Sequence, residues 1–294
     1  MLPLGSYPYP RRVPLAALAL VLVAAFAHAS WNAIAKGAPG GAVLVFAYAS
    51  VSSLILLPCA IVAQAIDPGS LAWTVLAAGA LSGTLHGVYF VLLQRGYARG
   101  DLSVVYPLAR GSGPVFATLG AIVLLGDRPG PLALVGTAGI VGGVLVLLSG
   151  PSLPRGSAAG YALATGILIG TYTVWDGHLV RSLDVEPVVL MTIQEVTLAL
   201  LLAPVALRRR AELRVLRAQH ARAVCAIAIL SPAAYVLVLF ALRVAPVSYV
   251  APAREVSILV GALIGTRLLA EGQTRRRIAG AVAIVGGVLA LALG

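Results

Sequence analysis

Two arginines stand inside otherwise apolar stretches of this sequence. Arg110 lies in YPLARGSGPVF and Arg254 in VAPAREVSILV. A guanidinium is a fixed positive charge with a planar fork of donors, which suits a bound carboxylate or phosphate. The alternative is that each arginine ties helices together by bonding backbone carbonyls or an acid such as Glu195. The sequence leaves both interpretations open.

Three acidic residues accompany these arginines in the apolar stretches: Asp176, Glu195 and Glu255. A carboxyl group held in a low-dielectric cavity can take up and release a proton near neutral pH. Glu195 is the first candidate for such proton exchange because it lies in the middle of its apolar stretch, and Glu255 is the second. The alternative is that Glu195 or Glu255 neutralises Arg254. Both roles are compatible, because a proton that competes with a salt bridge acts as a switch.

Aromatic side chains in the same stretches can line a pocket for a small molecule, although they also fill packing gaps. The candidates are Trp31, Tyr89, Tyr172, Trp175 and Tyr235, with the polar neighbours Asn32 and Asp176. His28 and His86 have no cysteine or carboxylate at a metal-ligand spacing. We therefore expect neither a metal nor another cofactor.

The composition requires a membrane to hold these residues. Of the 294 residues, 60% are hydrophobic and 11% are charged, whereas ordinary soluble domains have about a quarter charged residues. A soluble fold could not bury so much apolar surface. The net charge of +11 is therefore attributed to arginines flanking membrane spans, and not to a nucleic-acid partner.

A transmembrane helix needs about 20 apolar residues, and the sequence contains ten such segments. They lie at residues 13–35, 41–64, 71–94, 102–125, 131–149, 157–180, 187–207, 222–242, 247–269 and 278–293. We predict an all-α integral membrane protein with ten transmembrane helices.

A shift of 144 residues superposes the two halves of the chain. It places IVGGVL at 140–145 on IVGGVL at 284–289, and Ala109-Arg110 on Ala253-Arg254. It also aligns Trp31-Asn32 with Trp175-Asp176. One offset that links matches along most of each half indicates an internal repeat. We predict two five-helix units, residues 13–149 and 157–293.

Each predicted unit crosses the membrane five times, so the second must begin on the opposite side. The result is an inverted repeat, an architecture of secondary transporters whose site lies near the midplane. Arg110 and Arg254 each precede the middle of their helix by about four residues, hence about 5–6 Å from the midplane at 1.5 Å per residue. Because the repeats are inverted, we expect the two arginines on opposite sides of a central cavity.

The sequence resembles a known transporter family. GDLSVVYPLARGSGPVFATLGAIVLLGDRP followed by GTAGIVGGVLVL resembles the EamA-type unit of the drug/metabolite transporter superfamily, and residues 245–293 resemble its second copy. The resemblance covers nearly the whole chain from about residue 13. It implies a ten-helix carrier of the plasma or inner membrane that exports small metabolites such as amino acids.

Other functions fit the sequence less well. A translocase of lipid-linked or amphiphilic substrates is the second transport hypothesis. An intramembrane lipid-modifying enzyme would need clustered acids or a nucleophile with its base, and no GxSxG or Walker-type motif is present. We therefore predict a carrier that is not an enzyme. Its partners would be a small-molecule substrate, protons and the lipid bilayer.

Membrane orientation and oligomeric state follow from weaker signals. With residues 1–12 outside, fourteen basic residues between the spans lie inside and five outside. The positive-inside rule thus favours external termini, whereas the family resemblance implies cytoplasmic ones. Glycine-rich segments at 131–149 and 278–293 permit close helix packing within the chain or at a dimer face, so a monomer and a homodimer both stay open.

Overall fold

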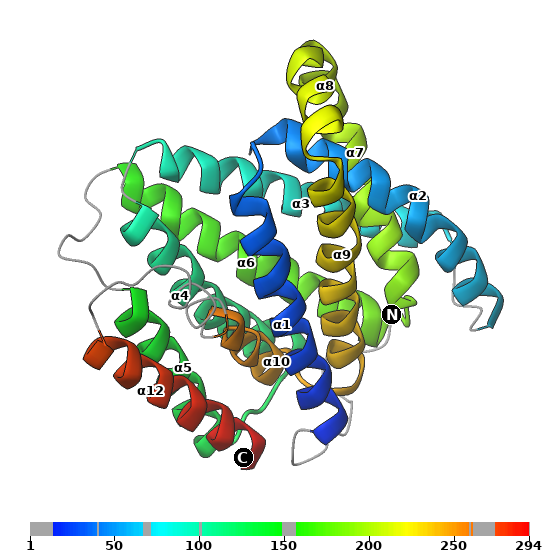
Figure 1. The fold of residues 1–294 in the computed structure, drawn as a ribbon. Helices are drawn as coiled ribbons and strands as arrows, with labels where there is room; N and C mark the ends of the chain where they lie inside the picture. Colours follow the sequence, from blue (N-terminus) through cyan, green and yellow to red (C-terminus); the bar gives the residue numbers. More distant parts are fainter. Residues whose placement is uncertain are drawn as a thin grey trace.

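The computed structural model describes residues 14–39, 41–66, 72–99, 102–148, 157–258, 260 and 274–293. Every regular element in this part of the chain is a helix (Figure 1). In order they are α1 (Leu15–Lys36), α2 (Ala42–Ile66), α3 (Trp73–Tyr97), α4 (Leu102–Gly120), η1 (Ala121–Leu125), α5 (Pro131–Leu148), α6 (Ser157–Ser182), α7 (Pro187–Arg208), α8 (Arg210–Gln219), α9 (Ala221–Val244), α10 (Val247–Ala253) and α12 (Thr274–Leu293).

Helices of this length and polarity make the chain a multi-pass integral membrane protein. Six helical segments among the described residues are long and apolar enough to cross a bilayer: Leu15–Ala35, Ala42–Ile66, Trp73–Tyr97, Leu108–Leu125, Pro187–Arg208 and Ala221–Val244. Large apolar side chains such as Leu15, Trp73 and Val123 are 77–85% exposed, as expected for a surface that faces lipid. The apolar parts of α5 and α12 are shorter, and the predicted span 247–269 is described only as far as Val260. Ten spans therefore stay a prediction.

Helices far apart in the sequence pack side by side. The closest pairs are α5 with α12, α4 with α6, α2 with α7, α1 with α9 and α3 with α6. Each pair joins one helix before residue 149 to one after residue 156. The centre of the bundle is consequently bounded by helices from both parts of the chain (Figure 1).

Glycines bring α5 and α12 into backbone contact. A Cβ atom at Gly136 would lie 2.6 Å from the carbonyl oxygen of Gly287, and one at Gly143 would lie 2.7 Å from that of Gly280. Such distances leave no room for any side chain. The glycine-rich faces that the sequence left open for a dimer are thus used within the chain.

The helix that carries Arg254 is interrupted at that residue. α10 ends at Ala253, one residue after Pro252, and Arg254 and Glu255 form a turn before helical geometry resumes at Val256. Within the turn the backbone N–H of Glu255 donates to the carbonyl of Pro252 at 3.0 Å. This i to i−3 bond is tighter than the α-helical pattern. Arg254 therefore extends from a break in the helix.

The start of α10 is capped by an acid from the other part of the chain. The Asp127 carboxylate accepts hydrogen bonds from the Ser248 backbone N–H at 3.0 Å and from its hydroxyl at 2.9 Å. The positions of Asp127 in LLGDRP and of Glu271 in LLAEGQ would let each residue cap the helix that follows it. In the structure the Asp127 carboxylate bonds to the start of α10. Glu271 lies outside the described residues.

Candidate functional site

A cavity of about 620 Å³ occupies the centre of the bundle. Helices α1, α2, α3, α4, α6, α7 and α9 line it, together with the turn after α10. The lining is largely apolar, from residues such as Ala24, Leu44 and Val238. Its few polar groups therefore determine what it can bind.

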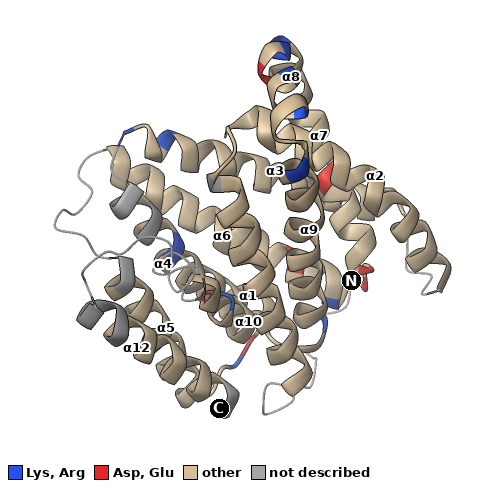
Figure 2. Cartoon of the chain, viewed as in Figure 1, with Lys and Arg blue, Asp and Glu red and all other residues tan. Residues whose placement is uncertain are grey.

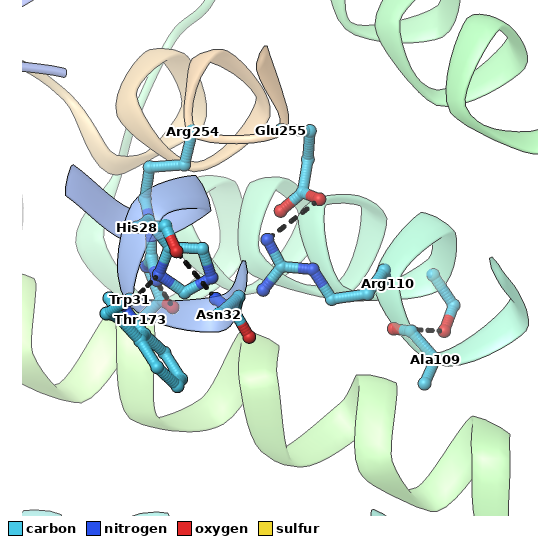
Figure 3. A network of polar contacts seen from close by, with 9 residues as sticks. His28, Trp31, Asn32, Ala109, Arg110, Thr173, Arg254 and Glu255 are labelled. Carbon is cyan, nitrogen blue, oxygen red and sulfur yellow. Dashed lines mark hydrogen bonds and ion pairs between the residues drawn. The ribbon is translucent and has the colours of Figure 1, made fainter. Parts of the chain in front are cut away.

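Arg110 reaches this cavity from the continuous helix α4. Its Nη2 atom lies 3.1 Å from Oε2 of Glu255, and the two side chains are 7% and 4% exposed. Figure 3 shows Glu255 extending from the turn after α10 toward Arg110. The two opposite charges neutralise each other within a buried site, where either charge alone would cost free energy.

Arg254 reaches the cavity from the turn after α10. Its Nη1 atom donates to the Thr173 hydroxyl at 3.4 Å, and its guanidinium lies 5.2 Å from the centre of the Tyr235 ring. In the described part of the chain these contacts are with neutral groups. The sequence left open whether Glu195 or Glu255 neutralises Arg254; in the structure the salt bridge of Glu255 is to Arg110. The guanidinium of Arg254 is oriented by its neighbours and can still receive an anion.

Aromatic rings form one wall of the cavity near Arg254. The ring centres of His86 and Tyr172 lie 3.9 Å apart, and Tyr172 is 6.0 Å from Tyr89 and 6.3 Å from Tyr235. The Tyr89–Tyr172 and Tyr172–Tyr235 pairs meet edge to face, the geometry that aromatic quadrupoles favour. Together these rings present a stiff surface against which a small molecule can pack.

Trp31 and Asn32 line the cavity from α1. The Trp31 indole N–H donates to Nδ1 of His28 at 3.3 Å, and the Asn32 amide donates to the His28 carbonyl at 2.7 Å. His28 is thereby held beside Arg254 (Figure 3).

Asp176 lies behind the wall of the cavity, with no exposed surface. It accepts hydrogen bonds from the Tyr235 hydroxyl at 2.6 Å, from the Gln194 amide at 3.1 Å and from Ser82. These partners lie on α9, α7 and α3, so one carboxylate on α6 joins four helices. The neighbouring Trp175 donates its indole N–H to the Ala78 carbonyl at 3.0 Å. Asp176 therefore reaches the cavity through Tyr235.

Glu195 lines the cavity from α7 and is 3% exposed. Its Oε2 atom has no hydrogen-bond partner among the described residues. Tyr48 lines the same cavity from α2. A buried carboxyl oxygen without a partner costs free energy.

The cavity brings together eight of the residues predicted from the sequence. These are Trp31, Asn32, Tyr89, Arg110, Tyr172, Glu195, Tyr235 and Arg254. Three predicted residues are absent from the lining: Asp176 and Glu255 contact residues of the wall, and Trp175 bonds to Ala78. Sequence reasoning missed Ser82, Thr173 and Gln194, which bond to Asp176 and Arg254. The available signal was their polarity inside apolar helices, but such side chains often bond only to their own backbone.

Comparisons with known proteins agree with this architecture. Residues 156–293 match the EamA-like transporter family. One solved structure, a crystal structure of a protein, shares the fold with a TM-score of 0.72 and 16% identity, and the match covers 95% of this chain and 97% of that chain. No curated protein matches the sequence. The family match confirms the resemblance over residues 156–293, the second of the two predicted copies.

Proposed function

We propose that this chain, whose residues 156–293 match the EamA-like transporter family, is a membrane transporter of the drug/metabolite transporter superfamily that exports small metabolites such as amino acids. Export would proceed by alternating access, with the two parts of the chain rocking around the central cavity. The observation that carries this proposal is the cavity of about 620 Å³ with Arg254 in its wall. A volume of this size suits a small metabolite.

In this proposal Arg254 binds the carboxylate of the substrate. Its contacts with Thr173 and Tyr235 hold the guanidinium in place without using its charge. The remaining surface that contacts the substrate comes from Trp31, Asn32, Tyr89 and Tyr172. Arg110 forms an ion pair with Glu255. Through this pair Arg110 positions the turn that carries Arg254.

The proposed architecture is an inverted repeat of residues 13–149 and 157–293, with ten crossings. The helix pairs support it. Under the 144-residue shift α1 corresponds to α6 and α9 to α3, and the pair α1–α9 has its counterpart in α6–α3. α2 packs on its own counterpart α7, and α5 on α12. Pairs of this kind are expected when two similar units are related by a two-fold axis.

Arg254→Gln tests the substrate site. Counterflow into liposomes containing the purified protein would be measured for a panel of amino acids, organic acids and amines. For the carboxylate-bearing substrates that wild type transports, we expect Arg254→Gln to reduce the rate about 10- to 100-fold, the effect of losing a charged hydrogen bond. Tyr48→Phe, another change in the lining, is the control. Normal transport by folded Arg254→Gln protein would refute the role of Arg254.

Glu195 is the proposed proton carrier. Its unpartnered Oε2 atom in the cavity suits a carboxyl group that alternates between protonated and ionised forms. A pH gradient imposed across the liposome membrane should accelerate transport by wild type. Glu195→Gln, which cannot ionise, should remove this acceleration and leave counterflow without a gradient largely intact. If both proteins respond equally to the gradient, Glu195 does not couple transport to protons.

A further inference from the structure

His28 is a polar residue of the central cavity whose ring nitrogens can donate or accept hydrogen bonds. It lines the cavity from α1, one helical turn before Trp31. Under the 144-residue shift His28 corresponds to Tyr172, which also lines the cavity. The helices around the cavity carry few charged residues (Figure 2). Uncharged donors and acceptors therefore decide much of what the cavity can bind.

The Trp31 indole determines which ring nitrogen of His28 carries the proton. An indole N–H donates and cannot accept, and its nitrogen lies 3.3 Å from Nδ1 of His28. Nδ1 must therefore accept, so it carries no proton. The imidazole is thus neutral, with its one ring proton on Nε2. The two rings also meet edge to face, with centres 5.1 Å apart, and this contact helps to hold the imidazole in one orientation.

The Nε2–H group of His28 is left to donate to a bound molecule. Within the part of the chain that the structure describes, the His28 ring makes one hydrogen bond, and it uses Nδ1. Nε2 is not one of the fully buried atoms that lack a partner in this part of the chain. It is therefore accessible from the cavity that His28 lines.

Arg254 is the cationic neighbour of His28. Its charge acts on the His28 ring, and Figure 3 shows the two side chains next to each other. Arg110, the second arginine of the lining, is paired with Glu255. An anion attracted to Arg254 would consequently meet a second donor, the Nε2–H group of His28.

We propose that His28 determines specificity at this site by donating its Nε2–H to one oxygen of the substrate carboxylate, while Arg254 pairs with the other oxygen. The inference rests on the proposed function, in which Arg254 binds a carboxylate. Two donors that face one group select a carboxylate, because both of its oxygens accept. A carboxamide presents one oxygen and one NH₂ group, so a donor of the site would face another donor, and the site rejects this analogue.

The test measures the binding of two matched probes, phenylacetate and phenylacetamide, to the full chain in non-ionic detergent. Both probes carry an aromatic ring, which suits the wall formed by Tyr89 and Tyr172, and they differ at the carboxylate. Isothermal titration calorimetry would give the Kd of each probe. Wild type should bind phenylacetate more tightly than phenylacetamide, and Arg254→Gln should weaken phenylacetate binding about 10- to 100-fold.

Two substitutions at His28 separate hydrogen-bond donation from shape. His28→Phe keeps a ring but cannot donate, so phenylacetate binding should weaken about tenfold, the effect of losing a hydrogen bond to a charged group. His28→Gln keeps an NH₂ donor and adds a carbonyl acceptor. It should bind phenylacetate within about threefold of wild type and phenylacetamide more tightly than wild type does. A purely structural role for His28 would not produce this gain.

His178→Phe is the matched control. His178 also lies beside a tryptophan, with its ring centre 6.1 Å from that of Trp175, but it is not among the described residues that line the cavity. Binding of both probes should therefore be unchanged. An equal loss of phenylacetate binding in His178→Phe and His28→Phe would overturn the proposal.

Nitrogen NMR of protein labelled at histidine tests the ring proton separately from affinity. The His28 signals, identified by their absence from His28→Gln, should be those of a neutral ring with its proton on Nε2. Phenylacetate should shift the Nε2 signal and leave the Nδ1 signal nearly unchanged. A proton on Nδ1 in wild type overturns the proposal, even if His28→Phe does not fold.

The binding results distinguish the role of His28 from that of Arg254. If Arg254→Gln weakens phenylacetate binding and folded His28→Phe does not, the role of His28 is refuted and that of Arg254 stands. If neither variant weakens it, or if wild type binds neither probe, the carboxylate site at Arg254 is refuted as well.

Discussion

Arg110 and Arg254 match under the 144-residue shift, yet the structure surrounds them differently. Arg110 lies within the continuous helix α4 and forms a buried ion pair with Glu255 at 3.1 Å. Arg254 lies in a helix break, beside the Thr173 hydroxyl and the Tyr235 ring. One arginine is neutralised within the protein, and the other keeps its charge available to the cavity.

The residues around each arginine explain this difference. Under the same shift Glu255 corresponds to Gly111, Thr173 to Ala29 and Tyr235 to Val91. Gly111 faces α5, where a Cβ atom would lie 2.9 Å from the end of the Leu145 side chain, so an acid there would have to displace that leucine. Duplicated positions can therefore diverge in role while the arginine itself is kept, because its neighbours decide how its charge is used.

The largest expected effect comes from breaking the ion pair. Glu255→Gln removes the carboxylate that balances the buried charge of Arg110, and we expect a loss of about 3–5 kcal/mol in stability. The thermal unfolding of the purified protein in detergent would show this as a lower midpoint. In the double variant Arg110→Gln/Glu255→Gln most of the loss should return. A stable Glu255→Gln single variant would mean that Arg110 has no need of Glu255.

A smaller effect is expected at Tyr235, which links Asp176 to Arg254. Tyr235→Phe removes the hydroxyl that donates to Asp176 at 2.6 Å and should reduce stability by about 1.5–3 kcal/mol if the carboxylate is ionised. The ring beneath Arg254 stays, so the KM for the carboxylate substrate should change little.

Tyr235→Leu is the matched variant, because it removes the ring as well as the hydroxyl. Loss of the cation–π contact, about 0.5–2 kcal/mol, should raise KM severalfold relative to Tyr235→Phe. The two variants would be compared by initial transport rates at varied substrate concentration. Equal KM values would show that the ring does not position Arg254.

The smallest loss of stability is expected for an exposed ion pair. It serves as the reference for the buried pair of Arg110 and Glu255. Arg243 contacts Asp184 at 2.5 Å, with side chains 25% and 74% exposed. Water and salt screen such pairs, so Arg243→Gln should cost less than about 1 kcal/mol. Thermal unfolding under the conditions used for Glu255→Gln provides the comparison. A loss as large as that of Glu255→Gln would show that burial is not what makes the Arg110 pair important.

Much of the fold could be predicted because bilayer thickness fixes how long an apolar segment must be. The observed helices α1, α2, α3, α7 and α9 begin and end within a few residues of the predicted spans. The helix α8 was not predicted, because the segment Arg208 to Arg222 was taken only as a polar connection. Its spacing of leucines and arginines was the signal that could have identified it.

Within the candidate site, the sequence could nominate residues but not their partners. Arg110, Arg254 and Glu195 were found because charged groups are costly in an apolar helix. Glu195 and Glu255 were both considered as partners of Arg254, whereas the salt bridge of Glu255 is to Arg110. The direction of a side chain at a helix break depends on backbone geometry that the residue types alone do not determine.

The sequence by itself determined that this protein lies in a membrane, that its two halves are similar and that it resembles EamA-type transporters. These conclusions follow from apolar length, from a constant offset and from local motifs, all of which can be read along the chain. Only the tertiary structure decided which arginine is paired, which acid has an unpartnered oxygen and which residues stand behind the wall of the cavity. Such features arise between helices far apart in the sequence, where close packing and the cost of unpaired buried polar groups select the contacts.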